Sequence, residues 1–334
     1  MIYSFNQKRG RRAWILLTAV LYLLWGCAHH QPLPDEPRHW VYQTDGSGPA
    51  MAERWAPAFV AYGHAEKFNR IGQPRVRLDS DGDQSVYVDP EAPVIYFMER
   101  SFLTEKASYT NLVYRVHFPK VPFSLIPFNL TAGKNVGILV VVTLDHSRRP
   151  VLITSVGTCG CYKAIVPTEY LPRDAYPAHW KAEPLDIYGE HLPPILNFRE
   201  IPAPRIFVYL RPGVHRVMDL EVRDAQDLSA ETFRIVPMRV EGMERLERLP
   251  VDGGTTSFYH HKGLLRGHVK GSVKPWETLL MSLISLDLFV GTDKAYADTA
   301  RTGNPFYTSL KPWRRQDSNM WDFARFLHYW GWRL

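Results

Sequence analysis

The feature that most constrains the fold is an almost uninterrupted apolar run at 136–144 (VGILVVVTL). A run of this length that is apolar on both faces is typical of a strand covered on both sides within a sheet. The chain then turns at 146–150 and enters a second apolar run at 151–156. Because so short a connection leaves no room for a crossover helix, the two strands are expected to pair antiparallel.

Similar segments extend this pattern along much of the chain. Two short segments, 76–78 and 86–88, flank an Asp-Gly turn and predict a hairpin. Between the later strands, the proline-rich stretch 167–205 predicts a long surface excursion. Further strands are expected at 93–98, 111–118, 206–210, 215–222 and 232–240.

Helical patterns are concentrated in the C-terminal part. The segment 276–288 follows a proline suited to a helix start, and 319–330 follows Asp317 and Ser318, either of which can serve as N-cap. A short helix is also expected within 51–70. The predicted fold class is therefore α+β, with a mainly antiparallel β body and C-terminal helices. It forms a single domain at 51–334, β-rich over 70–245 and helical over 275–334.

The N-terminus has the pattern of an export signal. Four basic residues between positions 8 and 12 precede an apolar stretch at 13–25, which is too short to span a bilayer comfortably. The stretch ends in Leu24-Trp25-Gly26-Cys27, which resembles the lipobox of bacterial lipoproteins. The bulky Trp25 departs from that pattern, where a smaller residue is usual. An ordinary secretory signal with an incidental cysteine is the alternative.

The lipobox resemblance implies a processing route and a location. Signal peptidase II would remove residues 1–26, and Cys27 would carry acyl chains of the palmitate type. Several chains anchor stably because each buried CH₂ contributes roughly 0.8 kcal/mol. Residues 27–50 would then be the lipidated cysteine and a flexible tether. Ala28, where an aspartate would favour the inner membrane, favours the outer membrane, with the domain facing the periplasm. Arg11 and Arg12 leave twin-arginine export open beside the Sec route.

Charge excludes one class of partner. The chain has 40 basic and 34 acidic residues, a net charge of +6, but four of the basic residues and none of the acidic ones precede Cys27. After cleavage the net charge is +2, and no run of like charges is present. A nucleic-acid partner, which needs a concentrated basic surface, is therefore not expected.

The sharpest local pattern is Cys159-Gly160-Cys161, directly after a predicted strand. The export signal implies an oxidising compartment, where two cysteines form an isolated pair rather than a disulfide framework. Three interpretations stay open: a strained disulfide between Cys159 and Cys161 or two buried thiols without a chemical role, a pair of thiolate ligands for a metal ion, or a redox-active dithiol.

Histidines supply a second candidate site. Neutral imidazoles ligate transition metals such as zinc or copper, so a metal could be held by the two cysteines together with some of these histidines. The alternative is a surface histidine cluster in a glycine-bounded loop. The candidate ligands are Cys159, Cys161, His117, His260, His261 and His268, with His215 as a further possibility.

Two weaker patterns have structural alternatives. Asp79, Asp81 and Asp83 could bind calcium, but position twelve of the loop lacks the bidentate glutamate of an EF-hand, so a solvated turn is favoured. The aromatic C-terminus could bind a glycan, but amphipathic helices bury such rings routinely.

The residues after the N-terminal segment contain no motif by which a family can be named. We therefore expect a membrane-anchored periplasmic lipoprotein with a role in binding or envelope assembly. Its partners would be the lipid bilayer, through acylated Cys27, and an envelope protein or glycan. The alternative is a periplasmic metal- or thiol-dependent enzyme that uses Cys159 and Cys161 with nearby histidines, and the question of enzymatic activity is left open.

Overall fold

The apolar run forms an interior strand of a large sheet. In the computed structural model, which describes residues 33–36, 38–78, 80, 82–125, 128–228 and 232–334, this run is β7 (Gly133–Leu144). Its side chains alternate between two cores: Ile138 and Val140 lie in one, and Leu139 and Val141 lie in the other. The run is apolar on both faces because each face meets a separate core.

Ten strands form the sheet, in the spatial order β13-β12-β2-β1-β14-β5-β6-β7-β8-β9. The stretch from β5 to β9 is antiparallel throughout, as the short connections predict. The other strands are β1 (His39–Thr44), β2 (Ala58–Ala61), β5 (Val94–Leu103), β6 (Ser108–Val121), β8 (Pro150–Gly157), β9 (Ala164–Pro167), β12 (Pro204–Leu210), β13 (Val217–Asp224) and β14 (Phe233–Gly242).

The sheet is mixed rather than purely antiparallel. Strand β14 runs parallel to both of its neighbours, β1 and β5, and β12 runs parallel to β2. These pairs join segments far apart in the sequence, so short turns do not specify them. The class predicted from the sequence, α+β with a mainly antiparallel β body, is confirmed.

Three small hairpins stand outside the large sheet. The first, β3 (Gln73–Leu78) with β4 (Gln84–Asp89), is the hairpin predicted from the Asp-Gly turn. Two of its candidate calcium ligands, Asp79 and Asp81, lie outside the described residues. The other hairpins are β10 (Leu185–Ile187) with β11 (Glu190–Leu192), inside the proline-rich excursion, and β15 (Leu249–Val251) with β16 (Gly254–Thr256).

The helices are shorter than the sequence patterns suggest. Helix α3 (Pro275–Ser285) ends before 288 because Leu286 adopts a left-handed conformation, with φ 51°. Helix α5 (Phe323–Tyr329) begins after Asp322, whose side chain accepts from the backbone N–H of Arg325, so the predicted N-caps Asp317 and Ser318 are wrong. Two further α-helices among the described residues are α2 (Ala50–Trp55) and α4 (Thr299–Thr302).

The N-terminal boundary also needs correction. Residues 39–44, expected within a flexible tether, form β1 and pair with both β2 and β14. The ordered sheet therefore begins well before residue 51. Cys27 and the export signal lie outside the described residues. Within the described residues, no helix has the length and apolar character needed to cross a bilayer.

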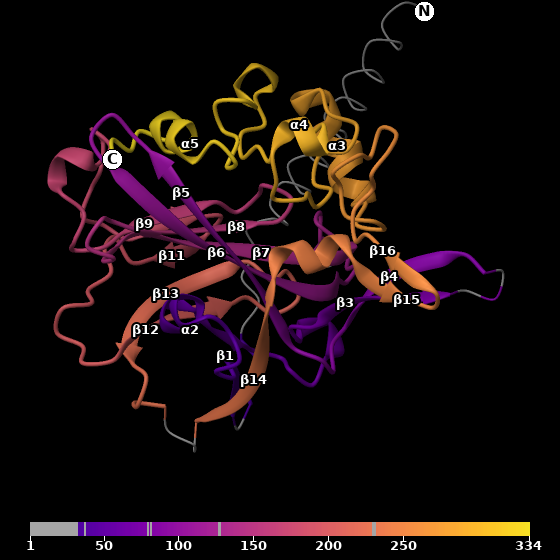
Figure 1. Ribbon diagram of the computed structural model, residues 1–334, viewed down its shortest axis with the longest axis horizontal. Helices are drawn as coiled ribbons and strands as arrows, with labels where there is room; N and C mark the ends of the chain where they lie inside the picture. The colour runs from indigo at the N-terminus through magenta and orange to yellow at the C-terminus, as the bar shows by residue number, and fades with distance from the viewer. Residues whose placement is uncertain (1–32, 37, 79, 81, 126–127, 229–231) are drawn as a thin grey trace, which may run out of the picture.

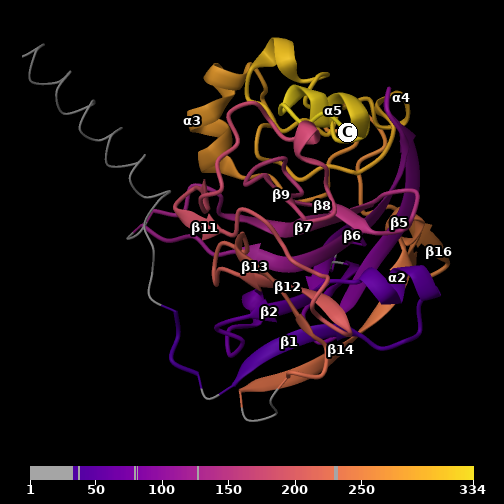
Figure 2. The same ribbon diagram turned by 90° about the vertical axis from the view of Figure 1, so that its left-hand side faces the viewer.

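The chain that follows β16 covers one face of the sheet. In Figure 1 it lies above β5–β9, in orange and yellow, and Figure 2 shows the same layer from the side. Its buried rings, including Phe258, Phe306 and Phe326, pack with Leu139 and Val141 in the second core. On the other face the sheet curls, so that residues of β1, β2 and β12 close the first core against β6 and β7. The C-terminal layer brings distant polar residues to the end of β8.

Candidate functional site

The two cysteines lie in a tight turn at the end of β8. The backbone N–H of Gly157 donates to the carbonyl oxygen of Cys161 at 2.8 Å, and Gly160 N–H donates to the carbonyl oxygen of Gly157 at 2.8 Å. Gly160 has φ +96°, and a Cβ there would lie 2.1 Å from the carbonyl oxygen of Tyr307. Only glycine fits this position, so the middle residue of Cys-Gly-Cys sets the turn that brings the cysteines together.

A segment of the C-terminal layer holds this turn in place. The backbone N–H of Lys294 donates to the carbonyl oxygen of Thr158 at 2.8 Å. The ammonium of Lys294, which is buried, donates to the carbonyl oxygen of Cys159 at 2.7 Å. The Thr158 hydroxyl also donates to the carboxylate of Asp293. These contacts fix the backbone of the turn on a rigid support.

A buried ion pair stands beside the sulfurs. Lys274 Nζ lies 3.2 Å from Asp293 Oδ2, with side chains only 4% and 1% exposed. Lys274 directly precedes α3, and Glu277 in the first turn of that helix reaches the second cysteine. The Cys161 thiol donates to Glu277 Oε1 at 3.2 Å, while Glu277 Oε2 is buried without a hydrogen-bond partner. The site therefore combines two thiols, a cation and two carboxylates.

These neighbours separate the acidities of the two thiols. The neighbouring side chain of Cys161 lowers the pKa of Cys159 below its ordinary value, and Lys274 acts in the same direction against the effect of burial. The proximity of Cys159, burial and nearby negative charge raise the pKa of Cys161 well above its ordinary value. Burial by itself lowers the pKa of Lys274, but Asp293 and the other acidic groups outweigh it and raise that pKa. The arrangement favours a thiolate at Cys159 and a thiol at Cys161.

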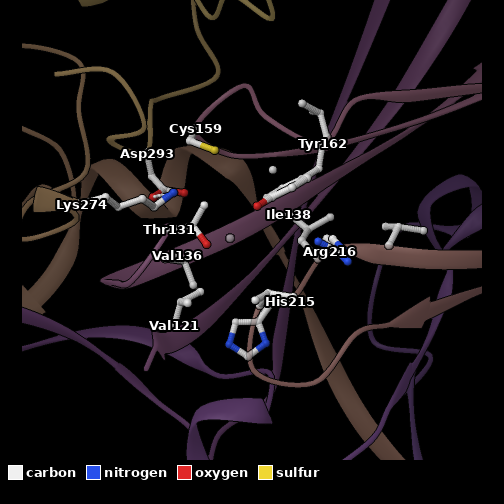
Figure 3. A pocket seen from close by; sticks show the side chains of 15 residues that line it. Val121, Thr131, Val136, Ile138, Cys159, Tyr162, His215, Arg216, Lys274 and Asp293 are labelled. Carbon is white, nitrogen blue, oxygen red and sulfur yellow. Dashed lines mark ion pairs between the residues drawn. The ribbon is translucent and has the colours of Figure 1, made fainter. Parts of the chain in front are cut away.

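Cys159 faces a small cavity (Figure 3). Its volume is about 30 Å³, enough to hold a water molecule. The walls combine apolar strand residues with polar groups, among them Thr131, Tyr162, Arg216 and Lys274. Cys159 is only 4% exposed, so a reactant of this cavity must be very small.

His215 also lines the cavity but is engaged elsewhere. Its ring stacks on Phe118 with centroids 4.3 Å apart, and its Nε2 hydrogen-bonds with the carbonyl oxygen of Lys120 at 2.9 Å. Burial lowers the pKa of His215 to about 4. It is a neutral wall residue at ordinary pH.

The other candidate histidines are dispersed. His117 is buried in β6 and accepts from Arg115 Nε at 2.9 Å, whereas His268 contacts the side-chain amide of Asn304. His261 is exposed, and His260 pairs through its backbone with His268. Among the residues that the structure describes, no three His, Cys, Asp or Glu side chains form a group that could hold a metal ion. The predicted set of cysteines and histidines is therefore not brought together.

Both cysteines are free thiols in the structure, which shows no bond between Cys159 and Cys161. The contacts described above surround two reduced thiols, and the interpretations of this pair stay predictions.

The aromatic C-terminus is mainly core. Phe306, Phe323, Phe326 and Trp332 are buried, and Trp313 is the prominent exception at 74% exposed. The structure gives these rings a packing role rather than the lining of a glycan groove.

The sequence did not reveal the partners of the two thiols. Glu277 is 116 positions from Cys161, and Asp293 is 135 positions from Thr158. One signal was present: Glu277 is the only charged residue within the otherwise apolar pattern of α3. A lone carboxylate in such a helix marks a position that needs a polar partner.

Comparisons with protein families, with curated proteins and with solved structures found no match to this chain.

Proposed function

We propose that this protein is a thiol-dependent redox protein, held at a membrane by lipid on Cys27, in which Cys159 and Cys161 cycle between dithiol and disulfide. One observation carries the redox proposal: the Cys159 sulfur accepts from the backbone N–H of Cys161 at 3.4 Å and lines a small cavity together with buried Lys274. A thiolate-forming cysteine next to a second, protonated cysteine is the arrangement needed for reversible oxidation.

The cavity indicates the class of oxidant. A protein disulfide cannot reach a sulfur that is 4% exposed behind a space of about 30 Å³, whereas a small hydroperoxide can. The thiolate of Cys159 attacks one peroxide oxygen and the O–O bond breaks. The leaving hydroxide or alkoxide takes a proton from water, and Cys159 becomes a sulfenic acid.

Cys161 then completes the oxidation. Its thiol gives its proton to Glu277, to which it already donates a hydrogen bond, and its sulfur attacks the Cys159 sulfur. The S–O bond breaks, the leaving hydroxide takes up a proton to form water, and a disulfide forms. The two thiols lose two electrons, and the peroxide gains them. An external dithiol would reduce the disulfide again by attacking the sulfur of Cys161, a residue that is more exposed than Cys159.

The test is intact-mass analysis of the purified, reduced protein after treatment with one equivalent of hydrogen peroxide. The wild type should lose about 2 Da as the disulfide forms. Cys161→Ser should gain about 16 Da and react with a sulfenic-acid probe, because the resolving thiol is missing. Cys159→Ser should stay unmodified. The proposal is wrong if Cys159→Ser reacts as the wild type does, or if the wild type reacts no faster than free cysteine.

The metal-dependent alternative has a separate readout. Zinc and copper analysis of the same reduced protein should give no stoichiometric metal. A full equivalent of either metal that disappears in the Cys159→Ser/Cys161→Ser variant would favour metal ligation over the redox cycle.

A further inference from the structure

Helix α3 exposes its apolar side chains and buries polar ones, the opposite of an ordinary surface helix. Its buried side chains are Glu277 and Ser285, while its leucines and isoleucine face outward. Leu283 is 84% exposed, and the apolar surface continues beyond the helix with Leu286 at 72%. A soluble helix normally turns such residues inward, so this face is built to be covered.

Neighbouring segments enlarge the apolar surface. At the start of α3, the rings of Phe123 and Trp276 stack with centroids 6.0 Å apart, and both are exposed. At its other end, Arg315 donates to the carbonyl oxygen of Ser285, which brings exposed Trp313 to this end of the helix. We name this surface the α3 face. It consists of Phe123, Leu125, Trp276, Leu279, Leu280, Leu283, Ile284, Leu286, Leu288 and Trp313.

We propose that the α3 face docks onto the surface of a lipid bilayer with anionic headgroups. The chemistry of the face agrees with this partner: exposed leucines would enter the acyl boundary, and Trp276 and Trp313 would lie at the headgroup level. The single carboxylate of α3, Glu277, is buried on the opposite side and is not presented to the membrane. Lys311 is exposed beside Trp313 and supplies positive charge at the rim, whereas exposed Arg314 is paired with Asp317 at 3.0 Å.

The length of the N-terminal chain supports the same partner. Cys27, the expected lipid site, precedes the first described residue, Leu33, by six positions. Six residues span at most about 20 Å, so a lipid on Cys27 would keep the domain close to the bilayer. In Figure 2, α3 and the first described residues lie on the same side of the molecule. Tethering raises the local concentration of bilayer at the α3 face, so weak insertion is enough for stable docking.

The docking proposal is independent of the redox cycle and is tested without it. The full chain, purified with its native N-terminus, is reconstituted into phosphatidylcholine–phosphatidylglycerol vesicles in which part of the phosphatidylcholine is brominated in its acyl chains. Bromine quenches tryptophan emission on contact. We expect quenching in the wild type and a loss of more than half of it in Trp276→Phe/Trp313→Phe. Replacing phosphatidylglycerol with phosphatidylcholine should reduce the quenching.

A matched pair of variants separates docking from general destabilisation. Leu283→Asp should also lose more than half of the quenching. Ile235→Asp places the same charge on another exposed apolar residue, in the part of β14 that pairs with β1, and should keep the wild-type quenching. Equal quenching in the two variants, or none in the wild type, overturns the proposal. A third outcome also overturns the proposal: the wild type forms a dimer in detergent solution, Leu283→Asp dissociates that dimer, and no quenching occurs on vesicles. The α3 face would then be covered by a second copy of the chain.

Discussion

Replacing Lys274 with methionine is the change that most directly probes the electrostatics of the thiol site. The ammonium lies 3.2 Å from Asp293, and both side chains are almost completely buried. Without Lys274, the Asp293 carboxylate keeps only the hydroxyl of Thr158 as a close partner. Breaking a buried ion pair by removing one member costs about 3–5 kcal/mol, because the remaining charge is left uncompensated.

We therefore expect Lys274→Met to lower the free energy of unfolding by about 3–5 kcal/mol, measured by urea denaturation under reducing conditions. The control is Lys274→Met/Asp293→Asn, which removes both charges and leaves an amide oxygen to accept from Thr158. Neutralising both partners should recover most of the loss, to within about 2 kcal/mol of the wild type. A single variant that loses less than about 1 kcal/mol, or a double variant as unstable as the single one, would refute the reasoning.

The remaining predictions concern the turn, a buried carboxylate and the anchor. Gly160→Ala should lower the free energy of unfolding by about 3 kcal/mol or more, because its Cβ would overlap a backbone carbonyl. Gly253, with φ +79°, has open space around it, so Gly253→Ala should lower that free energy by only about 1–2 kcal/mol. Thermal unfolding of the two variants measures the difference. Burial raises the pKa of Glu190, but two arginines outweigh it and hold the pKa below its usual 4.5. This carboxylate therefore stabilises the fold above pH 4.5, and the stabilisation is lost as the pH falls through the lower pKa that Glu190 has in the folded protein. Glu190→Gln should lower the free energy of unfolding at pH 7 and have the same free energy of unfolding as the wild type in the most acidic buffers. Finally, Cys27→Ala should block lipid labelling and cleavage by signal peptidase II, and normal maturation of that variant would refute the anchor.

Local sequence patterns predicted the antiparallel half of the sheet well. A run that is apolar on both faces predicted strand β7, and the short turn at 146–150 predicted its antiparallel pairing with β8. The parallel neighbours of β14 were not predictable in this way, because their partners at 39–44 and 94–103 are remote in sequence. Strand β1 was missed for the same reason: it is short, follows a proline-rich stretch and gains its order from partners elsewhere.

The candidate site was predicted only in part. The pattern around Gly160 singled out the two cysteines, and the structure places them in one turn rather than on an extended strand. The histidines, attractive as ligands by residue type, are scattered by the topology. The groups that surround the sulfurs, Lys274, Glu277 and Asp293, reach them only because the C-terminal layer folds back over the sheet. A sequence shows which residues have reactive or charged side chains, but tertiary contacts decide which of those side chains lie together.

The most direct test of the central proposal is the pH dependence of the reaction between hydrogen peroxide and the reduced wild-type protein. The neighbouring Cys161 side chain and the charge of Lys274 lower the pKa of Cys159, so its thiolate persists at lower pH than that of a free cysteine. The rate should rise through a single inflection below about pH 8.5, the value of a free thiol, and the inflection should move upward in Lys274→Met, which removes only the charge that lowers this pKa. An inflection at or above that value in the wild type would contradict an activated Cys159.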